Sequence, residues 1–403
     1  SDRNTVSKSE LLAFFNITKQ YIQHTIKANK RTDNLYHSYN LMTIENDTEV
    51  SISYLPEMLE GQVAVLSAGY LSPKEALDVL DGMKNSALFR EDQYSYILYP
   101  NKDLPRFDKK NVISKLSVDK SELLSKLVAD NNSQIINKDI SGKYHFNASF
   151  NNANRLEETF KKLPKEYTAL VEKESAFVLE IFEEVFNHKA FTGRSGTFFG
   201  YEGLGSIYWH MVSKLLLAVQ ENCLLAVKNN ESEALIGKLL DHYYEIQAGI
   251  GVHKSPELYG AFPTDPYSHT PGGKGAQQPG MTGQVKEDVL SRIGELGVFV
   301  KEGKINFNPR LLRASEFVTG SKVFTYTAIN KEAKSIEINK GSLCFTYCQV
   351  PVVYKNEGNE SVKIFFTDNS VKEINELTLD ESTSELIFER TGTIEKIEVS
   401  VKI

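Results

Sequence analysis

The chain has 403 residues, and its 46 basic against 53 acidic side chains give a formal net charge of −7. This length suits two or three domains with sizeable cores, while the mild acidity is unlike the basic surface that nucleic-acid binding requires. Three cysteines are too few for a disulfide framework or a four-cysteine zinc site, and no apolar run reaches the ~20 residues of a membrane-spanning helix, so we expect no nucleic acid, metal or membrane as a partner.

Apolar residues up to about Leu296 recur mostly at helical spacing. The third predicted helix has a clear start, because Ser72 can cap it and Pro73 suits the first helical position. The pattern predicts helices over residues 11–26, 59–70, 73–83, 120–130, 154–163, 165–186, 204–228, 231–247 and 284–296.

After Gly303 the apolar segments become short and β-branched, with turn residues at close intervals, which is typical of an antiparallel sandwich. Cys344 and Cys348 alternate with apolar residues and are expected to be ordinary strand residues. We therefore predict an α+β chain with a helical domain over residues 1–300 and a β-sandwich over residues 301–403. The predicted strands cover residues 322–328, 335–338, 343–353, 361–367, 371–377, 385–389 and 394–401.

Glycine is concentrated in two stretches, residues 193–205 and 272–283, and each stretch precedes a predicted helix. Such loops let the backbone approach a ligand closely, and they direct the free N–H groups of a helix start toward it. Either stretch alone could be a long connection that needs positive φ angles. Because two of them occur together with polar residues, we favour a binding site.

The first stretch leads into a helix that carries Glu202, Trp209 and His210 near its start. Glu202, Ser206 and His210 are four residues apart and share one helix face. A histidine beside an apolar stripe can equally be a core residue, so the functional interpretation and the structural one stay open here.

The second stretch contains Lys274 and Gln277 and ends at Thr282 and Gly283. Thr282 lies where an N-cap is expected, so its hydroxyl and the N–H of Gly283 could form an anion pocket. The order of residues is not that of a Walker loop. An ordinary threonine cap is the alternative interpretation.

A third polar cluster lies near the start of the chain and contains Asp33, Tyr36 and His37. Glu57 and Glu60 follow it, three residues apart and expected on one helix face. Aromatic and amide side chains around a carboxylate suit sugar binding. A solvated loop and a solvated helix face are the alternatives.

Two segments, EGLGSIYWH over residues 202–210 and GKGAQQPGMTG over residues 273–283, occur in this order and are followed by a segment over residues 296–311. Together they resemble the inverting disaccharide phosphorylases of the cellobiose and chitobiose phosphorylase type. In that family a Glu-Asn-Gly…His segment opens one barrel helix and a Gly-Arg…Thr-Gly segment opens the last. Here Glu-Gly-Leu-Gly replaces Glu-Asn-Gly, and Lys274 replaces the arginine.

The resemblance implies an (α/α)6-type barrel, here incomplete, followed by a C-terminal β-sandwich. It implies phosphorolysis of a β-linked disaccharide or oligosaccharide with inversion, with inorganic phosphate as co-substrate and no cofactor. Carried over to this chain, Asp33 is the catalytic acid, although the tryptophan and second aspartate of the family's acid segment are missing. Phosphate is then held by His210, Thr282 and Gly283. The implied substrate-binding residues are Glu202, Tyr36, His37, Glu60, Trp209, Lys274 and Gln277.

The family also has an N-terminal β domain and more helices than are predicted here, so we expect the chain to be the C-terminal part of a longer protein. Its expected partners are a carbohydrate, phosphate and the rest of that protein. An inverting hydrolase on the same scaffold is the nearest alternative, and it needs a second carboxylate ~6.5–9.5 Å from the acid. Glu60, Glu202 and Asp265 are the candidates. A non-catalytic glycan-binding or structural domain is the other alternative.

Overall fold

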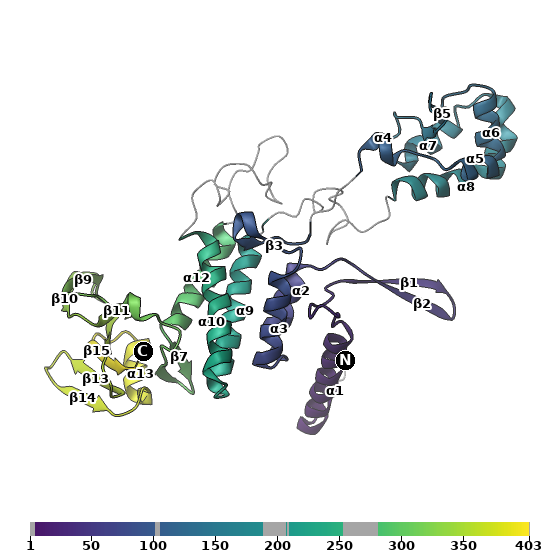
Figure 1. The fold of residues 1–403 in the computed structure, drawn as a ribbon. Coiled ribbons are helices and arrows are strands. Elements are labelled where there is room, and N and C mark those ends of the chain that lie inside the picture. The colour runs from purple at the N-terminus through teal and green to yellow at the C-terminus, as the bar shows by residue number, and fades with distance from the viewer. Residues whose placement is uncertain (1–4, 101–104, 188–206, 208, 253–280, 403) are drawn as a thin grey trace. The chain divides into compact units, whose positions relative to one another are not determined.

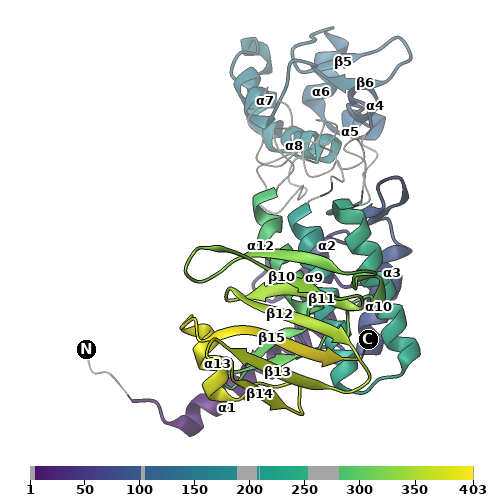
Figure 2. The same cartoon turned by 90° about the vertical axis from the view of Figure 1, so that its left-hand side faces the viewer.

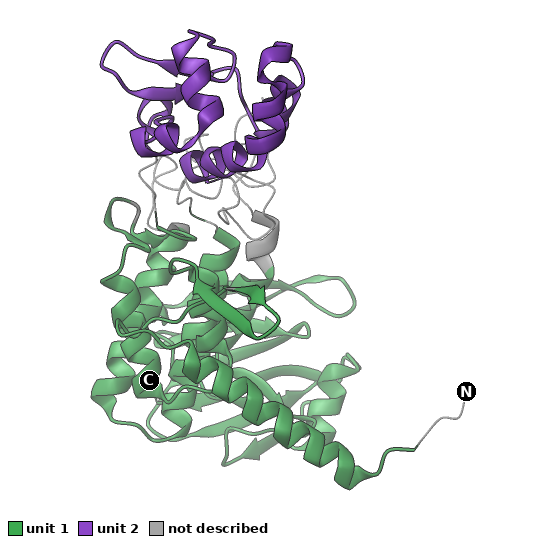
Figure 3. Ribbon diagram, turned by 90° about the vertical axis from the view of Figure 1, so that its right-hand side faces the viewer, with its two compact units in different colours: residues 1–100, 205–403 green, residues 101–204 purple. Residues whose placement is uncertain are grey.

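A computed structural model describes residues 5–100, 105–187, 207, 209–252 and 281–402 of the chain (Figure 1). The chain forms two compact units, one built from residues 1–100 together with 205–403 and the other from residues 101–204 (Figure 3). The second unit is thus inserted in the sequence of the first. The expected domain boundary near residue 300 lies within the first unit and stays a prediction.

The first unit is organised around one buried helix, α9. It is buried on nearly all sides because α2, α3, α10 and α12 pack against it (Figure 1). Ser72 caps α3 as predicted, and a capping box with Glu75 completes this start. The described helices of this unit are α1 (Lys8–Ala28), α2 (Leu59–Ser67), α3 (Pro73–Lys84), α9 (Trp209–Lys228), α10 (Glu233–Gln247) with the π-turn η4 (Ala248–Val252), α12 (Met281–Glu295) and α13 (Glu381–Phe388).

A five-stranded sheet near the C-terminus has the order β11-β12-β15-β13-β14 (Figure 2). Its neighbours are antiparallel except β12 and β15, which are parallel. Its strands are β11 (Ser342–Tyr347), β12 (Val350–Asn356), β13 (Ser361–Phe366), β14 (Val371–Ile374) and β15 (Ile394–Val401). Hairpins are formed by β1 (Asn40–Asn46) with β2 (Glu49–Tyr54), β3 (Phe89–Arg90) with β4 (Ser95–Tyr96) across η1 (Glu91–Gln93), β7 (Val298–Lys301) with β8 (Lys304–Phe307), and β9 (Lys322–Thr327) with β10 (Ala333–Ile338), while η5 spans Ala314–Glu316.

The mixed helical and sheet class is confirmed, and the C-terminal part contains a mostly antiparallel sheet, while the sandwich stays a prediction. The five-stranded sheet shares its core with the β7–β8 hairpin and with α13. The predicted strand over residues 385–389 was wrong, because Asp380 caps the helix α13 by accepting the N–H of Thr383. A helical barrel stays a prediction.

The predicted strand over residues 343–353 is two strands, β11 and β12. Cys348 and Gln349 both have positive φ angles, 47° and 68°, as the two central residues of a tight type I′ hairpin turn require. Cys344 is a strand residue as predicted, but Cys348 lies in this turn.

The second unit is a small helical domain with a short hairpin. Its core contains Leu123, Leu127, Phe146 and Phe182. The carboxylate of Glu174 accepts the Ser121 hydroxyl and the first N–H groups of α6, which stabilises that helix start. The elements are α4 (Phe107–Lys110), α5 (Lys115–Lys120), α6 (Glu122–Ala129), β5 (Ile136–Lys138), β6 (Tyr144–Phe146), α7 (Ala153–Phe160), η2 (Lys165–Tyr167) and α8 (Thr168–Phe186).

Candidate functional site

His210 lies in the first turn of α9 and faces α12. Its Nε2 is 3.3 Å from Oε1 of Glu287, and its side chain keeps 22% of its surface exposed, whereas that of Glu287 keeps 5%. Farther along both helices, the Gln220 amide donates to the carbonyl of Ser291. The two helices therefore run in the same direction, and their starts lie at the same end.

Thr282 and Gly283 are in the first turn of α12. The helix already includes Met281, so Thr282 is not the N-cap that its position in the sequence predicted. The N–H groups of a first helical turn have no acceptor within the helix, so this turn can still present them to an anion. Thr282 precedes Glu287 by five residues, or about 7.5 Å along the axis. The phosphate-binding role of Thr282 and Gly283 stays a prediction.

A buried hydrogen-bonded cluster fixes α12 against α9 and α10. Glu295, which is 3% exposed, accepts the hydroxyl of Tyr243 at 2.7 Å and the amide of Gln247 at 2.5 Å. Arg292 donates to its other oxygen and also pairs with Glu316. Since every oxygen of this buried carboxylate has a partner, the cluster stabilises the packing of the three helices.

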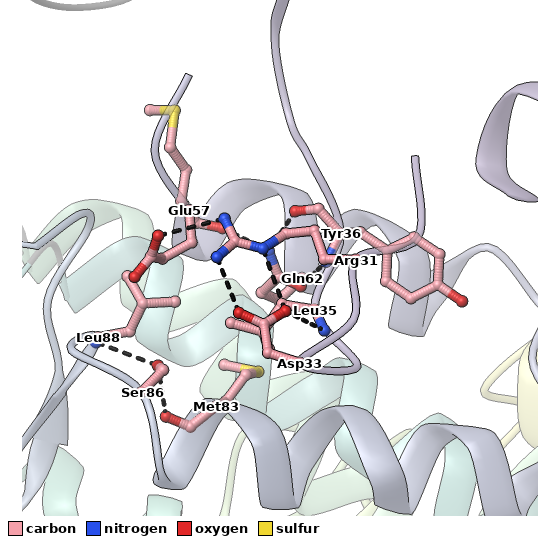
Figure 4. A network of polar contacts seen from close by, with 10 residues as sticks. Arg31, Asp33, Leu35, Tyr36, Glu57, Gln62, Met83, Ser86 and Leu88 are labelled. Atoms are coloured by element: carbon pink, nitrogen blue, oxygen red, sulfur yellow. Dashed lines mark hydrogen bonds and ion pairs between the residues drawn. The ribbon is translucent and has the colours of Figure 1, made fainter. Parts of the chain in front are cut away.

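Asp33 belongs to a second polar network, drawn in Figure 4. The Arg31 guanidinium donates to both oxygens of Asp33, at 3.1 and 2.8 Å, and to Glu57 at 3.2 Å. Burial alone would raise the pKa of Asp33, but the hydrogen bonds from Arg31 and from the N–H of Leu35 outweigh it and leave the pKa below its usual value. In this state Asp33 is an ionised carboxylate.

The residues around this network are held by α2. The amide of Gln62 donates to the carbonyl of Tyr36 and accepts its N–H, and Tyr36 is a core residue at 4% exposure. Glu60 accepts the Tyr39 hydroxyl at 2.8 Å. The expectation that Glu57 and Glu60 share a helix face was wrong, because α2 begins at Leu59 and Glu57 precedes it.

His37 stacks on Tyr54, with ring centroids 4.1 Å apart. Burial and the positive charge of Arg31 lower the pKa of His37. Trp209 is 6% exposed and belongs to the main core, so little of its ring can stack on a sugar. Glu202, Lys274, Gln277 and Asp265 lie outside the described residues.

Contacts between the helices place Asp33 at the same end of the unit as His210. The backbone carbonyl of Asp33 lies against Gly82, near the end of α3. Lys84, at the end of α3, pairs with Glu245 near the end of α10. Only four residues connect α9 to α10, so the two are antiparallel and the end of α10 lies beside the start of α9.

Sequence reasoning missed Glu287, Arg31 and Gln62. Glu287 shares a four-residue spacing with Ser291 and Glu295, and all three are buried. The sequence contained this pattern, because polar residues at four-residue spacing lie on one helix face where an apolar stripe would be expected. For Arg31, the only signal in the sequence was its position two residues before Asp33.

Among the residues that the structure describes, no three His, Cys, Asp or Glu side chains lie together as metal ligands would. Nor does any helix in the described ranges combine the length and apolar character that crossing a bilayer takes.

A family model described as GH149 phosphorylase insertion domain 2 matches residues 104–189. This stretch includes the whole described part of the second compact unit, residues 105–187. The second unit is therefore similar to a domain of a glycoside phosphorylase family, while the narrower resemblance of the chain to the cellobiose and chitobiose phosphorylase type stays a prediction. A comparison with curated proteins found no match to the chain.

Proposed function

We propose that the chain carries out phosphorolysis of a β-linked disaccharide or oligosaccharide with inversion at the anomeric carbon. Phosphate would bind at the shared end of α9 and α12, held by His210, Thr282 and the N–H of Gly283. The observation that carries the proposal is the contact of His210 with Glu287, which sets the imidazole beside the first turns of α12. The match of the inserted unit to a phosphorylase domain supports the same reaction class.

In the proposed reaction a phosphate oxygen attacks the anomeric carbon, and the bond to the glycosidic oxygen breaks. Asp33 gives its proton to that leaving oxygen, so the products are a sugar 1-phosphate and a saccharide shortened by one residue. Phosphate is the nucleophile, and for this reason no second carboxylate is needed to activate water. The implied roles of His37, Glu60, Lys274 and Gln277 are in saccharide binding.

The ion pair with Arg31 bears directly on this role of Asp33. A general acid must hold a proton near neutral pH, but Arg31 lowers the pKa of Asp33. A bound saccharide must therefore bury the carboxyl group or draw Arg31 away before Asp33 can act, since desolvation raises a carboxyl pKa. The Arg31 guanidinium can remain paired with Glu57 when it leaves Asp33, because the two already form an ion pair.

Two matched variants test the proposal. Asp33→Asn should abolish the formation of sugar 1-phosphate from phosphate and a panel of β-linked disaccharides. Glu57→Gln removes the other carboxylate of Arg31 and should retain most of this activity. A dinitrophenyl β-glycoside, whose leaving group needs no proton, should restore turnover in Asp33→Asn.

Equal losses in the two variants, without this rescue, would show that Asp33 acts only through the ion pair. Release of free sugar without sugar phosphate would point to hydrolysis. If binding of a glycan is detected and no product forms, the chain is a binding domain.

A further inference from the structure

We infer that Glu287 is a positioning residue that holds the His210 imidazole in its phosphate-binding form, an inference that rests on the proposed function. A carboxylate only accepts hydrogen bonds, so the His210 nitrogen at 3.3 Å from Glu287 must carry the hydrogen. This fixes both the ring orientation and the protonation of Nε2.

The contrast between Glu287 and Glu295 supports this role. Both are buried on the same face of α12, at 4% and 3% exposure. Glu295 has partners at both oxygens, whereas Oε2 of Glu287 is buried without a hydrogen bond among the described residues. A cluster built only for packing would satisfy Glu287 as fully as Glu295, because an unpaired buried oxygen is costly.

Two basic side chains lie beside the Glu287 carboxylate. Lys286 lies 3.6 Å from Oε1, but its side chain is 68% exposed, so solvent weakens this pair. His210 is the more buried partner of the carboxylate, since its side chain is 22% exposed.

Phosphate oxygens accept hydrogen bonds, so an imidazole that binds phosphate must donate. With Nε2–H directed to Glu287, the ring donates from Nδ1 only when both nitrogens are protonated. Glu287 thus accepts one of the two N–H groups of the phosphate-bound ring and leaves the other, at Nδ1, to the anion. Without this carboxylate, the ring loses the acceptor that fixes its orientation, and its N–H is no longer held toward the anion.

The test uses the full chain with 15N-labelled histidine, and His210→Asn assigns the resonances of His210. In the unaltered protein the His210 ring should show a protonated Nε2. In Glu287→Gln the 15N shift of Nε2 should change because its charge-assisted hydrogen bond is lost, and the dissociation constant for inorganic phosphate should rise about tenfold for the same reason. Glu295→Gln, at an equally buried carboxylate of the same helix, should leave the His210 shifts in place and change phosphate affinity less than about twofold.

An unprotonated Nε2 in the unaltered protein overturns the inference, and this measurement needs no folded variant. So does an effect of Glu295→Gln on ring shifts and affinity as large as that of Glu287→Gln. If His210→Asn weakens phosphate binding but Glu287→Gln does not, the inference fails and the phosphate site stands. Unchanged phosphate affinity in His210→Asn overturns the phosphate site itself.

Discussion

Two helical glycines should respond in opposite ways to the same substitution. A Cβ atom added at Gly294 in α12 would lie 2.1 Å from Oε1 of Gln220, whereas one added at Gly237 in α10 would meet nothing within 4 Å. Gly→Ala in a helix interior gains about 1 kcal/mol from backbone entropy. Gly237→Ala should therefore stabilise the first unit, and Gly294→Ala should destabilise it.

The cost at Gly294 follows from the contacts of Gln220. This side chain is 2% exposed, and its amide donates to the hydroxyl of Tyr243 and to the carbonyl of Ser291. Moving it away breaks both hydrogen bonds in a buried place, at about 1–2 kcal/mol each. After the gain in helix propensity, a net loss of about 1–3 kcal/mol remains.

The thiol of Cys223 provides a local assay. It is fully buried in α9, and burial raises its pKa to about 12, so it reacts only when the helix opens. With Cys344 and Cys348 replaced by serine, Gly294→Ala should speed labelling of Cys223 by about 5- to 160-fold, as the free-energy loss implies. Gly237→Ala should slow it.

A second cycle tests whether Gln220 is the cause. In a Gln220→Ala background the space beside Gly294 is open, so Gly294→Ala should no longer destabilise the protein. If labelling speeds up as much in this background as in the native one, the clash is not with Gln220. Equal behaviour of the two single glycine variants would refute the packing argument altogether.

Three further predictions concern buried or capping side chains. Tyr243→Phe leaves Glu295 and Gln220 short of a partner and should cost about 1–3 kcal/mol in urea unfolding. In the second unit, the Asn111 amide bonds both the N–H and the carbonyl of Phe146, so Asn111→Ala should lower the stability of that unit by about 2 kcal/mol, measured by hydrogen exchange of its amides. Burial raises the pKa of Asp380, but hydrogen bonds from Lys372, Ser382 and Thr383 outweigh it, so the pKa is well below its usual value. The stability that Asp380 contributes is present above its unfolded pKa of about 3.9 and is lost as the pH falls through the folded value; thermal unfolding of Asp380→Asn should accordingly depend less on pH below about pH 4.

The helices were predictable because their signals are local. The stretch predicted as residues 73–83 is α3 (Pro73–Lys84), and periodicity placed α8 and α10 equally well. Turn signals were harder to weigh. The hairpin of β1 and β2 was missed although Val50, Ile52 and Tyr54 alternate with serines in β2. These apolar side chains are exposed rather than part of a core. At α13, β-branched composition outweighed the capping signal of Asp380 in the prediction, although the cap determines the structure there.

The insertion of the second unit could not be inferred from the sequence. Composition and periodicity describe each helix by itself. The first unit instead depends on the packing of α2 and α3 against α9, and about a hundred residues of the inserted unit separate these helices in the sequence. For the same reason, His210 was identified from its glycine-rich surroundings, but its partner Glu287 was not. A contact across 77 residues leaves no local pattern.

The buried polar face of α12 explains how the candidate site obtains its geometry. Apolar contacts alone would let two parallel helices slide or rotate, because dispersion is not directional. Hydrogen bonds of Gln220 to Ser291 and of Tyr243 to Glu295 fix the register of α12 instead. The first turn of α12 and His210 are thus positioned by a cluster about three turns away. A variant that loosens this cluster should therefore change phosphate affinity only to the extent that it displaces α12.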